Sequence, residues 1–202
     1  MAALVVAASA VAEGQGSPEK PESPSGVARL LSAQGDVLDV PTKGKVHPPF
    51  KKDSPQFSMP GGPSPVALLR LPEYQAPYGL IITSARRGIG RTTEIFVPSL
   101  IFFDADFNEL GSYGAEGAGP SIAPGGSGVL KDISKEFQFD DSKKHTRYVL
   151  IFTRADMVGG RVAGAQGAIA TGVVKLIRAK VERSFEGNVQ VETKPQKAGK
   201  TR

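Results

Sequence analysis

The sequence predicts an all-β protein, an antiparallel β-sandwich of jelly-roll or immunoglobulin-like type. Short segments in which apolar and polar residues alternate recur along the chain, and glycine-rich loops separate them. The 202 residues include 24 glycines and 16 prolines, which interrupt helices and favour short strands joined by turns. Hydrophobic residues make up 40% of the chain, enough for the core of one domain.

The chain is expected to divide into four segments. The first residues are rich in alanine and valine and carry small residues at the spacing of a signal-peptidase site. A basic stretch before them is missing, so the signal is weak or truncated, and an alanine-rich terminus without a targeting role is the alternative. The expected segments are a signal peptide (1–12), a linker with a short helix (13–44), the sandwich (45–185) and a flexible basic tail (186–202).

A short helix is expected within the linker. Residues 13–25 are rich in Pro, Ser, Gly and Glu and are expected to be disordered. Ser25 is the expected N-cap of the helix, and Gly35 is expected to end it. Val27 and Leu31 would then lie on one face, together with Leu30 between them.

Strands are expected wherever β-branched and aromatic residues gather or alternate with polar ones. The clearest alternation places Ile133, Phe137 and Phe139 on one face of a half-buried strand. Residues 173–182 would also suit a helix, but the glycine before them favours a strand. The expected strands cover residues 57–59, 66–71, 78–83, 95–107, 133–139, 148–152 and 173–182.

The segment Ile95–Phe107 is the densest apolar run of the chain, and it ends in acidic residues. Its central part, Leu100–Phe103, is apolar at consecutive positions, as expected of a strand between two packed layers. In such a sandwich Phe102, Phe137 and Phe152 would be buried between the layers.

Composition excludes several classes of function. The chain contains no cysteine, so disulfides, thiolate catalysis and cysteine-ligated zinc are excluded. The net charge is +5, but the aromatic residues fall inside strand patterns rather than among the basic clusters, so we predict no nucleic-acid partner. No segment approaches the roughly 20 apolar residues of a membrane-spanning helix.

The acidic turn after the apolar run resembles the opening of a calcium-binding loop. Asp104, Asp106 and Asn108 stand at alternate positions, but Glu109 occupies the place of the required glycine and Ala115 that of the bidentate glutamate. An ordinary turn capped by these side chains is the preferred interpretation, and no metal site is predicted. A hydrolase that uses the two aspartates would need two acids in one pocket at a controlled separation, and nothing in the sequence identifies such a pocket.

No other group of residues forms a catalytic constellation. His47 and His145 are the only histidines, and both fall in segments expected to be exposed. The segment Gly88–Thr92 lacks the lysine and the helix of a phosphate-binding loop. We therefore predict no enzyme, no catalytic residue and no cofactor.

Tyrosines in loops suggest a binding role, because exposed aromatic rings stack on sugar rings. Tyr113 lies in a glycine-rich loop, expected over residues 111–128, and Glu116 is close to it in sequence. Tyr74 precedes a strand, whereas Tyr78 within that strand is expected in the core. Tyr74, Tyr113 and Glu116, with the two aspartates Asp104 and Asp106, are the candidate binding residues.

Three segments carry a resemblance to a known family. They are Gln56–Val66 followed by Leu71–Tyr74, then Phe96–Asp104, then Arg147–Thr153. Their order and spacing are similar to those of the MalM family of maltose-operon periplasmic proteins, and the similarity extends over residues 29–182. The resemblance implies a periplasmic protein associated with carbohydrate uptake. It brings no set of functional residues to transfer.

The sequence thus predicts a non-enzymatic periplasmic accessory protein of maltose- or maltodextrin-type transport, with weak oligosaccharide binding. The alternative is a scaffolding module of the cell envelope whose basic face binds a protein or an anionic polymer. An oligosaccharide and an envelope protein are therefore the expected partners, and the sequence does not predict an oligomeric state.

Overall fold

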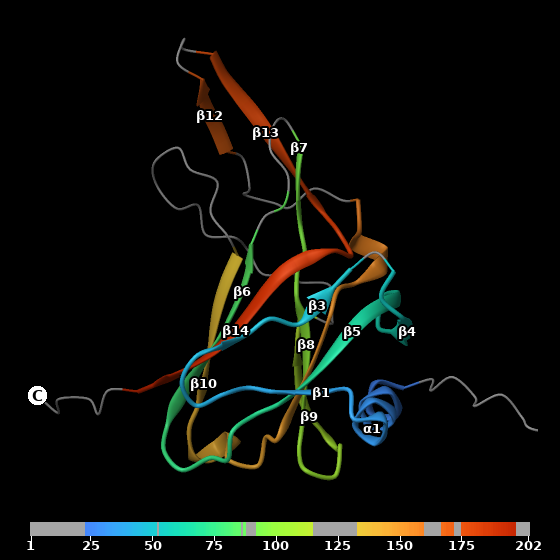
Figure 1. Cartoon of the computed structure of the whole chain (residues 1–202), viewed down its shortest axis with the longest axis vertical. Coiled ribbons are helices and arrows are strands. Elements are labelled where there is room, and N and C mark those ends of the chain that lie inside the picture. Colours follow the sequence, from blue (N-terminus) through green and yellow to red (C-terminus); the bar gives the residue numbers. More distant parts are fainter. Residues whose placement is uncertain are drawn as a thin grey trace, which may run out of the picture.

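The computed structural model describes residues 23–51, 53–85, 87, 92–114, 133–159, 167–171 and 175–196. The signal-like segment 1–12, the candidate residue Glu116 and most of the glycine-rich loop expected over 111–128 lie outside these ranges. The described residues form two packed β-sheets, one long helix and a small third sheet (Figure 1). No helix within these ranges is long and apolar enough to cross a membrane.

The first sheet has the strand order β1-β5-β11-β8-β9, and β4 forms a hairpin with β5. The pairs are antiparallel except β1 with β5, which is parallel. Its strands are β1 (Val37–Asp39), β4 (Gln56–Met59), β5 (Gly62–Arg70), β8 (Ser99–Phe103), β9 (Glu109–Tyr113) and β11 (Tyr148–Phe152).

The second sheet has the order β10-β6-β14-β2, and β3 also pairs with β14. All its pairs are antiparallel. Its strands are β2 (Lys45–Val46), β3 (Pro49–Phe50), β6 (Tyr78–Ala85), β10 (Ile133–Phe139) and β14 (Gly187–Pro195). The two sheets confirm the predicted all-β sandwich.

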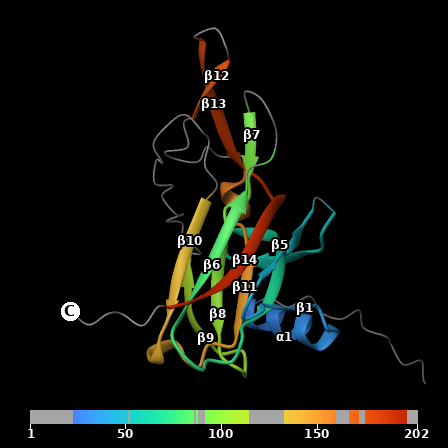
Figure 2. The ribbon, with the colours of Figure 1, turned by 60° about the vertical axis from the view of Figure 1, so that its left-hand side comes forward.

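A third sheet, β12-β13-β7, extends away from the sandwich (Figures 1 and 2). Its strands are β7 (Thr92–Ile95), β12 (Gly167–Thr171) and β13 (Lys175–Arg183). β13 pairs antiparallel with β12 and parallel with β7. The strand expected over residues 173–182 is therefore present.

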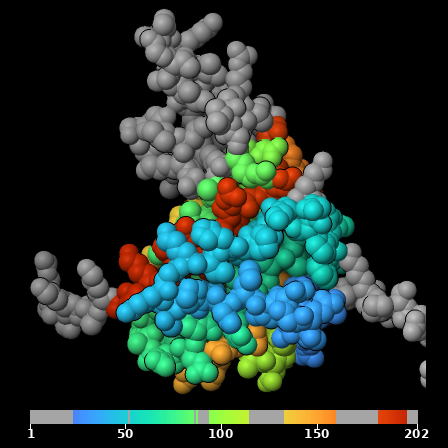
Figure 3. All heavy atoms as spheres, in the orientation of Figure 1, coloured from blue at the N-terminus to red at the C-terminus, as the bar shows by residue number. Residues whose placement is uncertain are grey.

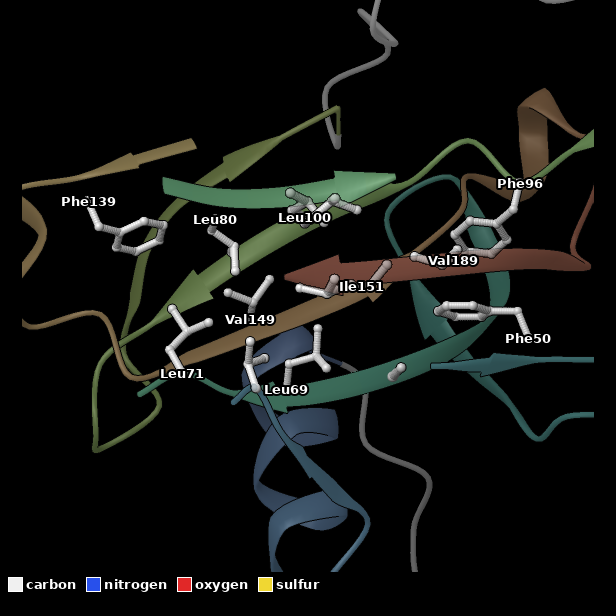
Figure 4. Packing of buried hydrophobic residues seen from close by; sticks show 14 of the residues in the cluster. Phe50, Leu69, Leu71, Leu80, Phe96, Leu100, Phe139, Val149, Ile151 and Val189 are labelled. Carbon is white, nitrogen blue, oxygen red and sulfur yellow. The ribbon is translucent and has the colours of Figure 1, made fainter. Parts of the chain in front are cut away.

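The core between the two main sheets contains the inward-facing side chains of both. Leu69, Leu100 and Ile151 come from the first sheet, and Leu80 and Val189 come from the second (Figure 4). All five are almost fully buried. Side chains alternate along each strand, so each of these residues shares the inner face with the residues two positions away in its own strand.

The outer face of the first sheet is also buried, because helix α1 (Pro24–Gln34) packs on it. Val27 and Leu31 of the helix contact a cluster that includes Ile101, Phe103 and Leu150. These strand residues alternate with those that face the other sheet, so β8 is apolar at nearly every position. The sequence predicts that β8 is buried on both faces, and the structure agrees. One face is covered by the second sheet and the other by the helix α1.

The N-cap of α1 lies two residues before the predicted one. The N-cap is Ser23, whose side-chain oxygen accepts a hydrogen bond from the backbone N–H of Gly26, and not Ser25. Pro24 follows at the first helical position, where its missing N–H costs nothing. The helix ends at Gly35 as predicted, with φ of 78° in the left-handed region.

The tail predicted over residues 186–202 is wrong for its first half. Residues 187–195 form β14, the strand that joins β6 to β2 in the second sheet. Val189 and Val191 are buried in the core, which places this strand in the interior despite its charged neighbours. The sandwich also begins before residue 45, with β1, and β9 occupies the start of the glycine-rich loop expected over 111–128.

Candidate functional site

The two main sheets end side by side at β9 and β10. β9 is the last strand of the first sheet and pairs only with β8 within the described ranges. β10 is the last strand of the second sheet and pairs there only with β6. A cavity of about 300 Å³ lies between them and is called the β9–β10 pocket below. It is lined by Phe102, Leu110, Gly111, Ser112, Tyr113, Phe137, Phe139, Lys143 and Thr146.

Aromatic rings form the inner wall of the pocket. Phe102 and Phe137 meet edge-on with ring centroids 5.6 Å apart, and Tyr113 meets Phe137 edge-on at 5.0 Å. Phe139, almost fully buried, closes the bottom and contacts Phe102 at 6.1 Å. Phe102 and Phe137 pack against the core between the sheets but are only half-buried, and Phe152 is buried on the outer face under α1. The expected burial of all three rings between the two layers is therefore wrong.

An exposed apolar residue and Lys143 are part of the pocket lining, and Lys135 lies next to the pocket, over the ring of Tyr113. Leu110 is 50% exposed. The Lys135 ammonium lies 5.6 Å from the centroid of the Tyr113 ring, and the Lys143 ammonium lies 6.0 Å from that of Phe139. Lys143 also donates to the backbone carbonyl of Gln138 at 3.0 Å. Among the residues that the structure describes, no carboxylate lines the pocket.

The acidic loop after β8 is a capped turn. The Asp104 carboxylate accepts hydrogen bonds from the backbone N–H groups of Asp106 and Asn108, at 2.9 and 2.8 Å, and from the side-chain amide of Asn108 at 2.9 Å. These donors, the Asn108 side chain first, hold the pKa of Asp104 below its usual range. The cap supports Phe107 at φ 62°, a conformation that non-glycine residues rarely adopt. Its ring stacks on Tyr148.

Tyr74 lies at a separate place. Its hydroxyl donates to the Asp141 carboxylate at 3.0 Å, and its ring lies 6.4 Å from that of Tyr78. Partial burial and Asp141 raise the pKa of Tyr74, and deeper burial raises the pKa of Tyr78 to about 12. A cleft of about 320 Å³ nearby is lined mainly by proline and polar residues around Tyr78.

The structure does not bring the candidate binding residues together. Tyr113 lines the β9–β10 pocket. Asp104 and Asp106 lie at the other end of the β8–β9 hairpin, where Phe103 pairs with Glu109, whereas Tyr113 pairs with Leu100. The two aspartates therefore belong to a turn and not to the pocket.

Sequence reasoning missed several residues of the pocket. Phe102 and Phe137 were expected in the core because their strands are apolar, and nothing local shows that both lie near a free sheet edge. Lys135 does carry a signal in the sequence. It falls on the face of β10 that also presents Ile133 and Phe137, which is an unusual position for a charged residue.

Several basic side chains of the described residues are paired with acids. Arg70 donates to both oxygens of Asp39, at 2.5 and 2.8 Å, and Lys45 lies 3.5 Å from Glu192. Such pairs reduce the net positive field that a scaffolding face would need. Within the described ranges, no three His, Asp or Glu side chains come together as a metal site.

Comparison with known proteins adds no relative. No family model matches the chain, and no curated protein matches it. The resemblance to the MalM family therefore stays a prediction from the sequence.

Proposed function

We propose that this chain is a non-enzymatic binding protein that holds a small ligand in the β9–β10 pocket. The observation that carries the proposal is the pocket itself: an aromatic-lined cavity between strands that are the last of their sheets in the described residues, with a few polar side chains in its lining. Ligand sites have this form, an apolar wall with a few polar groups that fix orientation. The lining offers no nucleophile paired with a base and no pair of acids, so binding is the activity that its chemistry supports.

We further propose an oligosaccharide as the ligand and a periplasmic role in carbohydrate transport. Tyr113 supports this proposal because it is the one loop tyrosine of the sequence analysis that lines the pocket. A sugar ring would stack on its face while Ser112 and Lys143 bind hydroxyl groups. Lys135 lies over the same ring, so the sugar would pack beside that ammonium or move it aside.

Isothermal titration with a maltodextrin series tests the proposal. We expect heat of binding for the wild type and roughly tenfold weaker binding for Tyr113→Ala, because one stacked ring is lost. Tyr74→Ala is the matched control, since Tyr74 does not line the pocket and should leave the affinity unchanged. If neither heat nor a thermal shift is observed across the series, the oligosaccharide proposal fails.

A further inference from the structure

The geometry points to an acidic ligand. We propose that the β9–β10 pocket takes a small molecule with an apolar body and a carboxylate, which Lys135 and Lys143 hold at the rim. The inference rests on the proposed function, because it names the chemical class of ligand for the same pocket. The shared chemistry is found in fatty acids and in uronic-acid sugars.

The first argument is the position of Lys135 in β10. Side chains alternate along this strand, and Ile133 and Phe139, both buried, lie on the same face as Lys135 and Phe137. That face points between the two sheets, but Lys135 itself is exposed at the sheet edge, so its ammonium is accessible to a ligand that enters beside Tyr113. The contact that the structure gives the ammonium is the face of the Tyr113 ring, a weak partner at an exposed site.

The second argument is that neither lysine forms an ion pair with a described acid, although the charge of Lys143 helps to lower the pKa of Asp140. Elsewhere cations meet acids, as in Arg70 with Asp39. Lys135 and Lys143, in contrast, lie within ion-pair distance of no carboxylate in the part of the chain that the structure describes.

The acids nearest to the two lysines in sequence are engaged by other donors. Asp140 accepts from the backbone N–H and the hydroxyl of Ser142. Asp141 accepts from Tyr74, and Glu136 accepts from the amide of Gln138. A carboxylate supplied by a ligand would therefore meet two cations that form no ion pair with the acids of the described residues.

The third argument is the size and lining of the cavity. At about 300 Å³ it has room for roughly ten water-sized groups, which matches a medium-length alkyl chain or one or two sugar rings. Its walls are aromatic, and Leu110 extends the apolar surface to the rim. An apolar body inside and an anionic group at the lysines would satisfy both parts of the site.

Two pairs of probes, each an acid and its neutral counterpart, test the inference. They are decanoate with decanol, and trigalacturonate with its methyl ester. Binding to the full chain is followed by tyrosine fluorescence, which is available because the protein has four tyrosines and no tryptophan. We expect the acid of at least one pair to bind about tenfold tighter than its neutral partner, with a preference that falls at high salt. The pair that shows the preference identifies the source of the carboxylate.

Variants of the lysines locate the effect. Lys135→Gln and Lys143→Gln should each weaken binding of the acid by roughly fivefold and weaken binding of its neutral partner clearly less. Lys51→Gln removes the same charge from an exposed position away from the pocket and is the matched control. Equal binding of acid and neutral probes would overturn the acidic ligand but leave the pocket as a binding site. Absence of binding by all four probes would also overturn the acidic ligand, while the maltodextrin titration decides separately whether the pocket binds an oligosaccharide.

Discussion

At one end of the sandwich interior, the buried rings of Phe50 and Phe96 stack with centroids 4.1 Å apart (Figure 4). At the other end, which is marked by Phe139 in Figure 4, Phe102 and Phe137 meet edge-on and stay half-exposed around a cavity. The same pair of sheets forms both ends. The stacked end contributes stability, whereas the end at β9 and β10 leaves aromatic surface for a ligand.

The sealed end depends on close approach of the backbone. A Cβ at Gly187, the first residue of β14, would lie 2.2 Å from the Cβ of Phe96. Only glycine allows this contact. At the other end the described residues offer no covering strand, because β9 and β10 are the last strands of their sheets.

The largest expected effect separates the two ends directly. Phe96→Ala should lower the free energy of unfolding by about 3–5 kcal/mol, because it leaves a cavity in a closed core. Phe137→Ala should cost only about 1–2 kcal/mol, because the ring is already half-exposed. Chemical denaturation of the two variants measures the difference. Equal losses would contradict the distinction between a sealed and an open end.

A second variant tests the close approach at the sealed end. Gly187→Ala should destabilise the protein by about 1–3 kcal/mol, because the added methyl group forces Phe96 to move. Asn188→Ala, at the next and exposed residue, is the control and should change stability little. Urea denaturation compares the two variants. A neutral Gly187→Ala would show that this end can adjust as freely as the open one.

The helix that seals the outer face of the first sheet gives a smaller effect. Ser23→Ala should lower the free energy of unfolding by about 1 kcal/mol, because the N–H of Gly26 loses its side-chain acceptor. Ser25→Ala, two residues further on, should change the free energy of unfolding little. Thermal unfolding of the pair decides which serine is the cap.

The smallest expected effect concerns the capped turn beyond the pocket. Because the pKa of Asp104 is lowered in the folded state, its contribution to stability is present above the unfolded value of about 3.9 and is lost as pH falls through the folded value. Asp104→Asn should therefore lower the melting temperature at neutral pH and lose less stability on acidification than the wild type.

Asp106→Asn is the matched control for this turn. The Asp106 backbone N–H donates to the cap, but its carboxylate accepts no hydrogen bond from another described residue, so the substitution should change the melting temperature little. Both variants should keep the affinity of the β9–β10 pocket. A loss of ligand binding in Asp104→Asn would return this residue to the binding site.

Much of this architecture follows from local patterns. The alternation in β6 and β10 predicts both their existence and their inward faces, and Gly35 predicts the end of α1. The strand β11 was also predicted, but its inward face was not, because Val149 and Ile151 face the other sheet while Leu150 and Phe152 face the helix. β14 escaped prediction because its two buried valines stand among polar and charged residues. Its stability comes from β6 on one side and β2 on the other, which are distant in sequence.

Only one residue of the β9–β10 pocket could be predicted from the sequence. Tyr113 could be selected because it is a tyrosine beside glycines, but its neighbours Phe102 and Lys143 come from other elements. Which strands lie at the edges of the two sheets is a property of the topology, and no local pattern encodes it. The same holds for the cover that α1 provides over Phe103.

The space-filling view shows where a ligand would have to be sought: α1, β1 and the β2–β3 segment cover much of the visible face (Figure 3), while the pocket belongs to β9 and β10. The most direct test is therefore a map of ligand contacts by nuclear magnetic resonance, with decanoate added to isotope-labelled protein. The account predicts chemical-shift changes concentrated at Phe102, Leu110 to Tyr113 and Lys135 to Phe139. Changes centred on Phe50 and Phe96, or spread evenly over the chain, would contradict it.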